Sequence, residues 1–277
     1  MSRYIYLKHF FILIIVLLSG SVYAQFSLIT WNIRDFGQSK SESEMDSIVK
    51  IVRHYDIIAI QEVVAGPGGP QAVARLADAL NRTGFKWQYE ISQPTTGSSS
   101  SRERYAFLWK PSRVTAIGRA WLDSTHAVQI DREPFMQEFK AGSLRFTLVN
   151  FHAISPSRQP ETEIKYFRNF PALYKGHNLV FLGDFNLTQS HTVFNPLKSF
   201  GYEPVLKGQK TSLKTVCENK NCLSGEYDNV FYPKSIMKPA KQGVVHFYTT
   251  YADLKQARYV SDHIPLWINM VPIAVGK

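Results

Sequence analysis

The chain has 277 residues, of which 44% are hydrophobic and 19% are charged, and its 32 Lys and Arg residues against 22 Asp and Glu residues give a net charge of +10. This composition excludes a disordered protein and a coiled coil, because the chain has enough apolar residues to form a core. A small scaffold held by several disulfides is also excluded, since only two cysteines are present. The length fits one large α/β domain or two smaller ones.

The first 24 residues have the pattern of a secretory signal peptide. Arg3 and Lys8 lead into an apolar run over residues 10–18, and small residues precede Ala24. The run is shorter than the ~20 residues that a membrane-spanning helix needs. We therefore expect cleavage after Ala24 and a secreted (extracellular or periplasmic) monomer without stable membrane association, built as a single domain over residues 25–277.

Helical and strand patterns alternate along the rest of the chain. The segments with helical character are residues 43–54, 69–81 and 160–174. The apolar, β-rich runs are residues 26–31, 57–60, 105–109, 144–151, 179–182, 230–232, 244–248 and 264–268. Most of these runs are apolar on both faces, which is typical of strands buried between two layers. The pattern predicts an α/β (α+β) fold in which two packed β-sheets are flanked by helices, a four-layer sandwich.

Polar residues border the predicted strands. Those directly after an apolar run are Asn32, Glu62, His152 and Asp184. Those directly before one are Glu103, Asp228, Asp262 and His263. The two sets can share one edge only if some strands run opposite to others, so we expect mixed or antiparallel sheets.

Such an edge has the groups that metal-assisted acid–base chemistry needs. Carboxylate and amide oxygens prefer Mg²⁺, Mn²⁺ or Ca²⁺ to zinc. Two histidines, each beside a carboxylate, suit a general acid and a general base. A divalent cation together with such a pair is what phosphodiester hydrolysis requires. After signal cleavage the net charge is +8, which favours a polyanionic substrate.

Each of these signals also has a simpler interpretation. Glu62 alone could be an exposed residue at a strand end, and residues 183–186 could form an ordinary turn. Ser261 followed by Asp262 and His263 suggests a serine hydrolase, but the chain lacks the G-x-S-x-G elbow of that chemistry.

The two cysteines lie close together in the sequence. Cys217 and Cys222 occur in a polar, turn-rich stretch that has no further Cys or His nearby to complete a zinc site. In an oxidising compartment we expect them to form a local disulfide, the alternative being two free thiols.

In combination, the motifs resemble the endonuclease/exonuclease/phosphatase superfamily, and within it the secreted deoxyribonuclease I group. They follow the order of the family and extend over nearly all of residues 26–269. The matching segments are WNIRDFG (31–37), IQEV (60–63), RERYAF (102–107), REP (132–134), NFH (150–152), LGDFN (182–186), YDN (227–229) and SDHIP (261–265). The resemblance implies the deoxyribonuclease I-like sandwich and a metal-dependent phosphodiesterase that uses Mg²⁺ or Mn²⁺.

The resemblance also implies a role for individual residues. Glu62 would be the principal metal ligand, and Asn32, Asp184 and Asp262 would complete or support the metal site. Two acid–base dyads would be formed, one by His152 with Glu103 and the other by His263 with Asp228. Asn186 would hold a phosphate oxygen or orient the water, and Arg34 and Arg132 would contact phosphates of the DNA strands. Whether His263 or Asp184 takes the proton from water stays open.

The chain departs from the deoxyribonuclease I pattern at four places. Val64 and Ser101 stand where the group has the Arg and Tyr of its minor-groove wedge, which leaves a preference for regular duplex open. The loop from Cys217 to Cys222 replaces a calcium-binding segment, and of a second calcium site only Glu133 and Asp123 remain. Structural Ca²⁺ is therefore disfavoured.

The sequence thus predicts a secreted endonuclease that cleaves DNA with low sequence specificity, with RNA and single strands as further possible substrates. The alternative within the same fold is a phosphatase or a phospholipase C-type, sphingomyelinase-like phosphodiesterase. A third alternative, an inactive binding protein, is disfavoured because every dyad member and proposed metal ligand is present.

Overall fold

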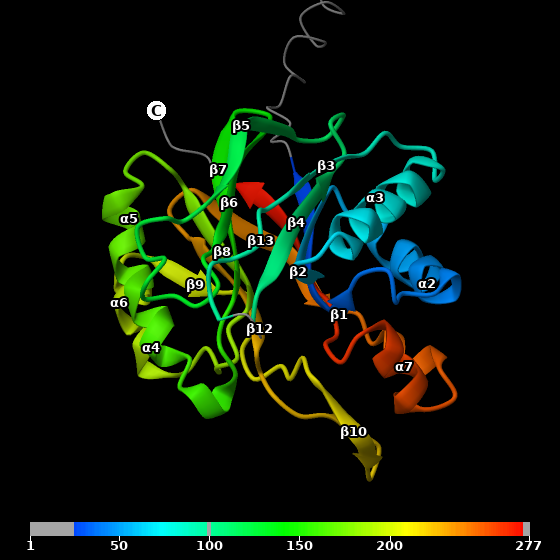
Figure 1. Ribbon diagram of the computed structural model, residues 1–277. Helices are drawn as coiled ribbons and strands as arrows, with labels where there is room; N and C mark the ends of the chain where they lie inside the picture. Colours follow the sequence, from blue (N-terminus) through cyan, green and yellow to red (C-terminus); the bar gives the residue numbers. More distant parts are fainter. Residues whose placement is uncertain (1–24, 99–100, 274–277) are drawn as a thin grey trace, which may run out of the picture.

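The computed structural model describes residues 25–98 and 101–273, so the predicted signal sequence lies outside the described residues. Two six-stranded sheets pack against each other, and helices cover their outer faces (Figure 1). The predicted four-layer sandwich is confirmed. Among the described residues, no helix is both long and apolar enough to cross a membrane.

The first sheet has the strand order β13-β14-β1-β2-β4-β3. Its strands are β1 (Phe26–Phe36), β2 (Ile57–Val64), β3 (Gln88–Ile91), β4 (Glu103–Trp109), β13 (Met237–Val244) and β14 (Leu266–Pro272). Strands β1 and β2 are parallel, whereas β14 and β4 run antiparallel to them. The helices that belong to this half are α2 (Glu42–Val52), α3 (Gly68–Asn81) and α7 (Leu254–Val260), with the 3₁₀ helix η4 (Phe247–Thr250).

The second sheet has the order β5-β6-β7-β8-β12-β9. Its strands are β5 (Thr115–Leu122), β6 (Phe135–Ala141), β7 (Leu144–His152), β8 (Leu179–Asp184), β9 (Tyr202–Pro204) and β12 (Asp228–Pro233). Strands β7 and β8 are parallel and β12 is antiparallel to β8, so both sheets are mixed, as the polar pattern predicts. Its helices are η1 (Pro156–Arg158), α4 (Glu161–Ile164), η2 (Lys165–Asn169), α5 (Phe170–Leu173), η3 (Thr192–Phe194) and α6 (Asn195–Ser199). A separate two-stranded hairpin pairs β10 (Leu213–Glu218) with β11 (Asn221–Leu223).

Apolar packing and one polar bridge join the two sheets. Phe26 of β1 stacks on Phe146 of β7 with ring centroids 4.4 Å apart. Nearer the C-terminal ends of the parallel strands, the Gln61 side chain donates a hydrogen bond to Asn150 Oδ1, and the Asn150 amide donates to the Ile60 carbonyl oxygen at 3.1 Å. Because buried amide groups need hydrogen-bond partners, the Gln61–Asn150 pair fixes β2 against β7 at the residue before Glu62.

The helices show where local sequence decides the structure and where packing does. Helix α2 begins with a capping box, in which the Ser41 hydroxyl accepts from the Glu44 N–H and the Glu44 carboxylate accepts from the Ser41 N–H. The predicted helix over residues 160–174 is instead divided into α4, η2 and α5. Pro171 lies in the first turn of α5 and has no N–H to continue a preceding helix.

The strand predicted over residues 244–248 is wrong. Strand β13 ends at Val244, and the chain then turns into η4, which places the Phe247 ring 5.3 Å from that of Trp31 in the core. The apolar run therefore reflects burial in a turn rather than a strand. The strand itself lies upstream, in the exposed stretch that begins at Met237, where the polar sequence of an edge strand hides the signal.

Gly183 lets β8 approach β7 at the edge of the site. Its φ is +125°, and a Cβ atom there would lie 2.0 Å from the carbonyl oxygen of Phe151. We expect Gly183→Ala to lower the free energy of unfolding by about 3 kcal/mol or more, because strain and a backbone clash combine. Gly201→Ala is the matched control, since Gly201 has φ +88° but open space around it, and it should cost only about 1 kcal/mol. Equal losses in denaturant unfolding would contradict this interpretation.

Candidate active site

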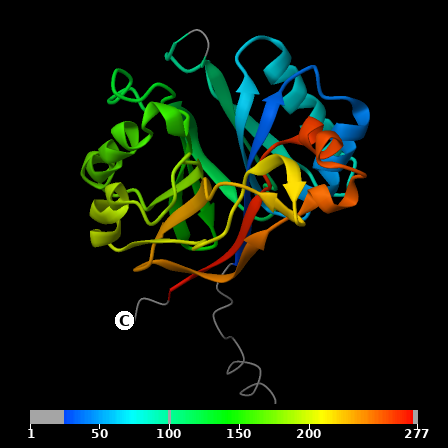
Figure 2. The ribbon, with the colours of Figure 1, turned by 90° about the horizontal axis from the view of Figure 1, so that it is seen from below.

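The predicted polar residues come together at one end of the sandwich. Strands β1, β2, β7 and β8 end there, and β4 and β12 begin there. Figure 2 views the molecule from this side, the lower side of Figure 1. The mixed strand directions are what bring residues at the ends of some strands next to residues at the beginnings of others.

Asp184 lies at the centre of this edge and is 1% exposed. Its Oδ2 accepts a hydrogen bond from the Asn32 amide at 3.0 Å and lies 3.5 Å from His152 Nε2 and 3.6 Å from His263 Nε2. Its Oδ1 accepts from the Asn186 N–H at 2.9 Å. Burial alone would raise the pKa of Asp184, but the two imidazoles and the hydrogen bonds lower it, so the group is a carboxylate.

Each imidazole next to Asp184 is held by a second carboxylate. His152 Nδ1 lies 3.0 and 3.1 Å from the two oxygens of Glu103, and His263 Nδ1 lies 2.8 Å from Asp228 Oδ2. Burial opposes charge on both rings, yet Glu103 raises the pKa of His152, and Asp228 with Asp184 raises that of His263 to about 10. In both rings Nδ1 faces its own carboxylate, which directs Nε2 towards Asp184.

Asn32 connects Asp184 to Glu62. Its Nδ2 also donates to Glu62 Oε1 at 3.0 Å, while its Oδ1 is buried and has no hydrogen-bond partner among the described residues. Glu62 has a φ of +60°, and its Oε2 accepts from the Asp35 N–H at 3.1 Å. A buried amide oxygen without a donor, on a side chain whose nitrogen already joins two carboxylates, is a group that a hard cation could complete.

A second group at the same edge also has metal-binding geometry. One ligand atom each from Asp184, Asp228 and His263 lies within 4.8 Å of the others. Asp184 is thus common to two groups that could hold a metal ion, one with Asn32 and Glu62 and the other with Asp228 and His263.

Arg132 and Asn186 share one backbone acceptor beside the first dyad. The Arg132 guanidinium donates to the carbonyl oxygens of His152 and Ala153, and its Nη1 lies 3.7 Å from Glu103 Oε2. The Asn186 amide donates to the same Ala153 oxygen at 3.0 Å. Two polar side chains are thus fixed next to His152.

Two of the predicted site residues point elsewhere. The Asp262 carboxylate pairs with Arg258 at 3.2 Å, and Arg34 is half-exposed and pairs with the exposed Asp35 at 3.4 Å. Their side-chain contacts within the described part of the chain lie outside the network around Asp184.

Two supporting hydroxyls were not assigned from the sequence. The Ser261 hydroxyl donates to the Asn32 carbonyl oxygen at 2.6 Å and accepts from the His263 N–H at 3.0 Å, so it is a brace between two site segments rather than a nucleophile. The Thr211 hydroxyl accepts from the Asp228 N–H at 3.0 Å. No short-range pattern marks either residue, because both act through contacts distant in sequence.

Glu163 was also missed. It is 3% exposed, and its two oxygens accept from the N–H groups of Asp131 at 2.6 Å and Ile154 at 2.9 Å. Asp131 directly precedes Arg132, and Ile154 directly follows Ala153. Glu163 therefore joins the segment of Arg132 to the segment whose carbonyl oxygens accept the Arg132 hydrogen bonds. A glutamate in a helical pattern is ordinarily exposed, which is why the sequence gave no signal.

A groove of about 310 Å³ lies beside the first dyad. Its walls include Glu62, His152 and Arg132 together with Val64 and Ser101. The Ser101 hydroxyl donates to Asp131 Oδ2 at 2.6 Å. The groove therefore opens where the deoxyribonuclease I pattern has its two larger wedge residues.

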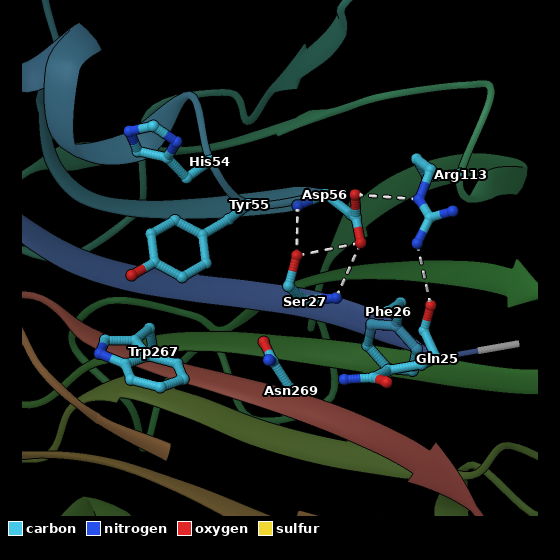
Figure 3. A pocket seen from close by; sticks show the side chains of 9 residues that line it. All are labelled: Gln25, Phe26, Ser27, His54, Tyr55, Asp56, Arg113, Trp267 and Asn269. Carbon is cyan, nitrogen blue, oxygen red and sulfur yellow. Dashed lines mark hydrogen bonds and ion pairs between the residues drawn. The ribbon is translucent and has the colours of Figure 1, made fainter. Parts of the chain in front are cut away.

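A cavity of about 490 Å³ lies at the opposite end of β1. Figure 3 shows Asp56 in it, accepting hydrogen bonds from the backbone and hydroxyl of Ser27 and from Arg113. Because this carboxylate is fully paired and joins β1 to the chain after β4, the cavity is a structural junction distant from the Asp184 network.

The sequence profile of the Endonuclease/Exonuclease/phosphatase family matches residues 29–263, which contain the whole edge described above. The chain belongs to this family. A deoxyribonuclease of Thioalkalivibrio sp. (strain K90mix) is 30% identical over 280 residues, covering 94% of this chain and 74% of its own length. Deoxyribonuclease-1 of Bos taurus is 28% identical and covers 87% of this chain and 90% of its own.

The fold agrees with this assignment. The human Nocturnin catalytic domain superposes with a TM-score of 0.61 at 14% identity, covering 92% of this chain and 97% of that one. The family predicted from the sequence is thus confirmed, and its relatives include deoxyribonucleases.

The bridge made by Glu163 can be tested by removing one acceptor. Glu163→Gln keeps the size of the side chain but leaves one buried N–H, of Asp131 or Ile154, without an acceptor. We expect the free energy of unfolding to fall by about 1–3 kcal/mol. Glu161→Gln, on the same helix, should cost little.

The same variant tests whether Glu163 positions Arg132. If it does, Glu163→Gln should reduce phosphodiesterase activity in the wild-type background. In an Arg132→Ala background it should cause almost no further loss of activity. Full additivity of the two losses in this double-mutant cycle would assign Glu163 to stability alone.

Proposed function

We propose that the protein is a secreted, divalent-metal-dependent endonuclease that hydrolyses the phosphodiester bonds of DNA with low sequence specificity. The observation that carries this proposal is the position of Asp184 between two carboxylate–imidazole dyads and the Asn32–Glu62 pair. The deoxyribonuclease relatives, which match most of the chain, support DNA as the substrate.

We assign the metal ion to Glu62, Asn32 and Asp184. The unpartnered Asn32 Oδ1 and the all-oxygen donor set fit Mg²⁺ or Mn²⁺. When bound, such an ion neutralises the charge that develops on the phosphoryl oxygens. Asp262 is directed towards Arg258, so its contribution would be to fix the segment before His263 rather than to bind the ion.

The remaining site residues would bind the phosphate and transfer protons. His152 and His263 both direct Nε2 into the site, so one charged ring can protonate the leaving oxygen, while the proton from water is taken by the Asp184 carboxylate or by the other ring in its neutral form. Glu103 and Asp228 keep these rings oriented and favour their charged forms. Arg132 and Asn186, fixed on Ala153, would hold phosphate oxygens on the His152 side.

The surroundings of the site also fit a nucleic acid. Arg34 is half-exposed near the Glu62 side, and the excess of basic residues attracts polyanions. The open groove at Val64 and Ser101 favours a substrate that is not restricted to regular duplex, so single strands and RNA are included in the proposal. We further propose that residues 25–277 act as a monomeric, secreted domain after removal of residues 1–24.

Supercoiled plasmid is the direct substrate with which to test this function. With Mg²⁺ the purified protein should convert it to nicked and then linear DNA, and EDTA should abolish the reaction, because the ligand set binds hard divalent cations. Sphingomyelin vesicles and a phosphomonoester should stay intact. Plasmid that remains supercoiled while sphingomyelin is cleaved would replace this proposal with the phospholipase alternative, and full cleavage in EDTA would exclude the metal.

The dyads predict how the catalytic rate responds to mutation. His152→Ala and His263→Ala should each lower kcat on plasmid or oligonucleotide DNA by roughly 10²-fold or more. Since both rings act on the same phosphate, the double variant should lose much less than the product of the single losses. His191→Ala is a suitable control, because that imidazole caps η3 outside the site. Near-normal turnover by His152→Ala would refute the dyad assignment.

A further inference from the structure

The β10–β11 hairpin projects from the body at the end that contains the site (Figure 1). It belongs to neither large sheet and forms a separate two-stranded sheet. Cys217 and Cys222 close it near its tip with the disulfide that the sequence predicts. Leu213 at its base packs into the core, but residues 215–221 beyond it are exposed, so the projecting part of the hairpin calls for a functional explanation.

The base of the hairpin is built into the second dyad. The Leu213 N–H donates to the Asp262 carbonyl oxygen at 2.6 Å, and Ser212 forms an isolated antiparallel bridge with His263. The Arg258 guanidinium donates to the Leu213 carbonyl oxygen at 2.8 Å. A ligand that contacts the hairpin is therefore held in a fixed position relative to His263.

The hairpin is also stiff along its length. Its two turn residues, Asn219 and Lys220, both have positive φ, 51° and 65°, as in the turn type that matches the twist of paired strands. Lys214 and Glu218 form an ion pair at 2.6 Å on one strand. Together with the disulfide, these features reduce the conformational freedom that binding would otherwise have to remove.

The exposed side chains of the hairpin and its approach include two that are basic and two that bear an amide. Lys210 lies just before the base and Lys220 at the tip, both exposed, and Glu218 is already paired with Lys214. Asn219 and Asn221 add exposed hydrogen-bonding groups. Val216 is the only exposed large apolar residue of the described hairpin, too little for insertion into a membrane.

We propose that the β10–β11 hairpin binds the phosphate backbone of the nucleic acid outside the cleaved bond, on the His263 side. This rests on the proposed function and adds to it a second binding surface. From Leu213 to Glu218 the strand spans about 17 Å, at ~3.4 Å per residue. Along a duplex this distance corresponds to roughly five base pairs, since one strand has a phosphate every ~3.4 Å of axis.

The hairpin would thus orient the substrate, a task to which the absent wedge residues would otherwise contribute. With Val64 and Ser101 in the groove, the contacts that orient a long substrate are reduced on the His152 side. Charged contacts at Lys210 and Lys220 restore orientation from the other side without reading sequence, because phosphates are the same at every base pair.

The test compares two double variants that remove the same charge. Lys210→Ala with Lys220→Ala removes two exposed positive charges from the hairpin and its approach. Lys140→Ala with Lys175→Ala removes two exposed positive charges at the opposite end of the second sheet. Each is assayed on duplexes lengthened one base pair at a time from the cleaved bond, and on bis(4-nitrophenyl) phosphate, which is too small to reach the hairpin.

The hairpin variant should lose about 10-fold in kcat/KM on long duplexes, and it should lose the gain that wild type shows as the duplex extends to roughly five base pairs. The slope of log(kcat/KM) against log[salt] should become less steep by about one to two units, roughly one for each phosphate contact that is lost. Hydrolysis of bis(4-nitrophenyl) phosphate should match that of the control variant. Equal rates of the two variants on long duplex would overturn the hairpin proposal, whereas a wild type that cleaves neither substrate would instead refute the proposed function.

A second variant tests stiffness independently of charge. Cys217→Ser with Cys222→Ser opens a loop too short to contribute much to global stability, so the Tm should change little. Binding to uncleaved duplex in EDTA, measured by fluorescence anisotropy, should weaken several-fold because the hairpin must then be ordered on binding. Unchanged affinity at an unchanged Tm would contradict preorganisation as the purpose of the disulfide.

Discussion

The candidate site depends on one buried charge. The Asp184 carboxylate has lost its contact with water, and such a group stays ionised only if cations and hydrogen-bond donors surround it. His152, His263 and Asn32 supply them, and Glu103 and Asp228 in turn stabilise the imidazoles. Since each member is stabilised by its neighbours, loss of one affects the whole network, which is why the dyads are expected to be non-additive.

The sandwich positions this network through mixed strand direction and close backbone approach. Asp184 and Asp228 are register partners on antiparallel β8 and β12, while His152 and Asp184 are register partners on parallel β7 and β8. Gly183 permits the β7–β8 contact, and the bridge between Gln61 and Asn150 fixes the other sheet against it. The proposed chemistry therefore depends on a few buried backbone and amide contacts, at residues next in sequence to the proposed catalytic groups.

Much of this arrangement could be predicted from the sequence, because strands buried on both faces are recognisable and the polar segments at their ends match the motifs of the family in order. The side-chain directions of Asp262 and Arg34 could not be predicted, because each side chain forms an ion pair with a residue near it in sequence. Asp262 pairs with Arg258, and Arg34 pairs with Asp35. The roles of Glu163, Ser261 and Thr211 depend on contacts distant along the chain. The sequence does not mark strand β13, because an exposed edge strand has a polar sequence. It predicts a strand after Val244, because burial in a turn gives the same apolar composition.

We propose that Asn32, Glu62 and Asp184 bind the metal and that the dyads remain free for proton transfer. Anomalous diffraction from crystals soaked in Mn²⁺ locates the ion without relying on activity. We expect a peak within about 2–2.5 Å of Asn32 Oδ1 and a Glu62 oxygen, with His263 still bonded to Asp228. A peak bound instead by Asp184, Asp228 and His263, the other group with suitable spacing, would contradict this metal assignment, because it would make the second dyad a metal site.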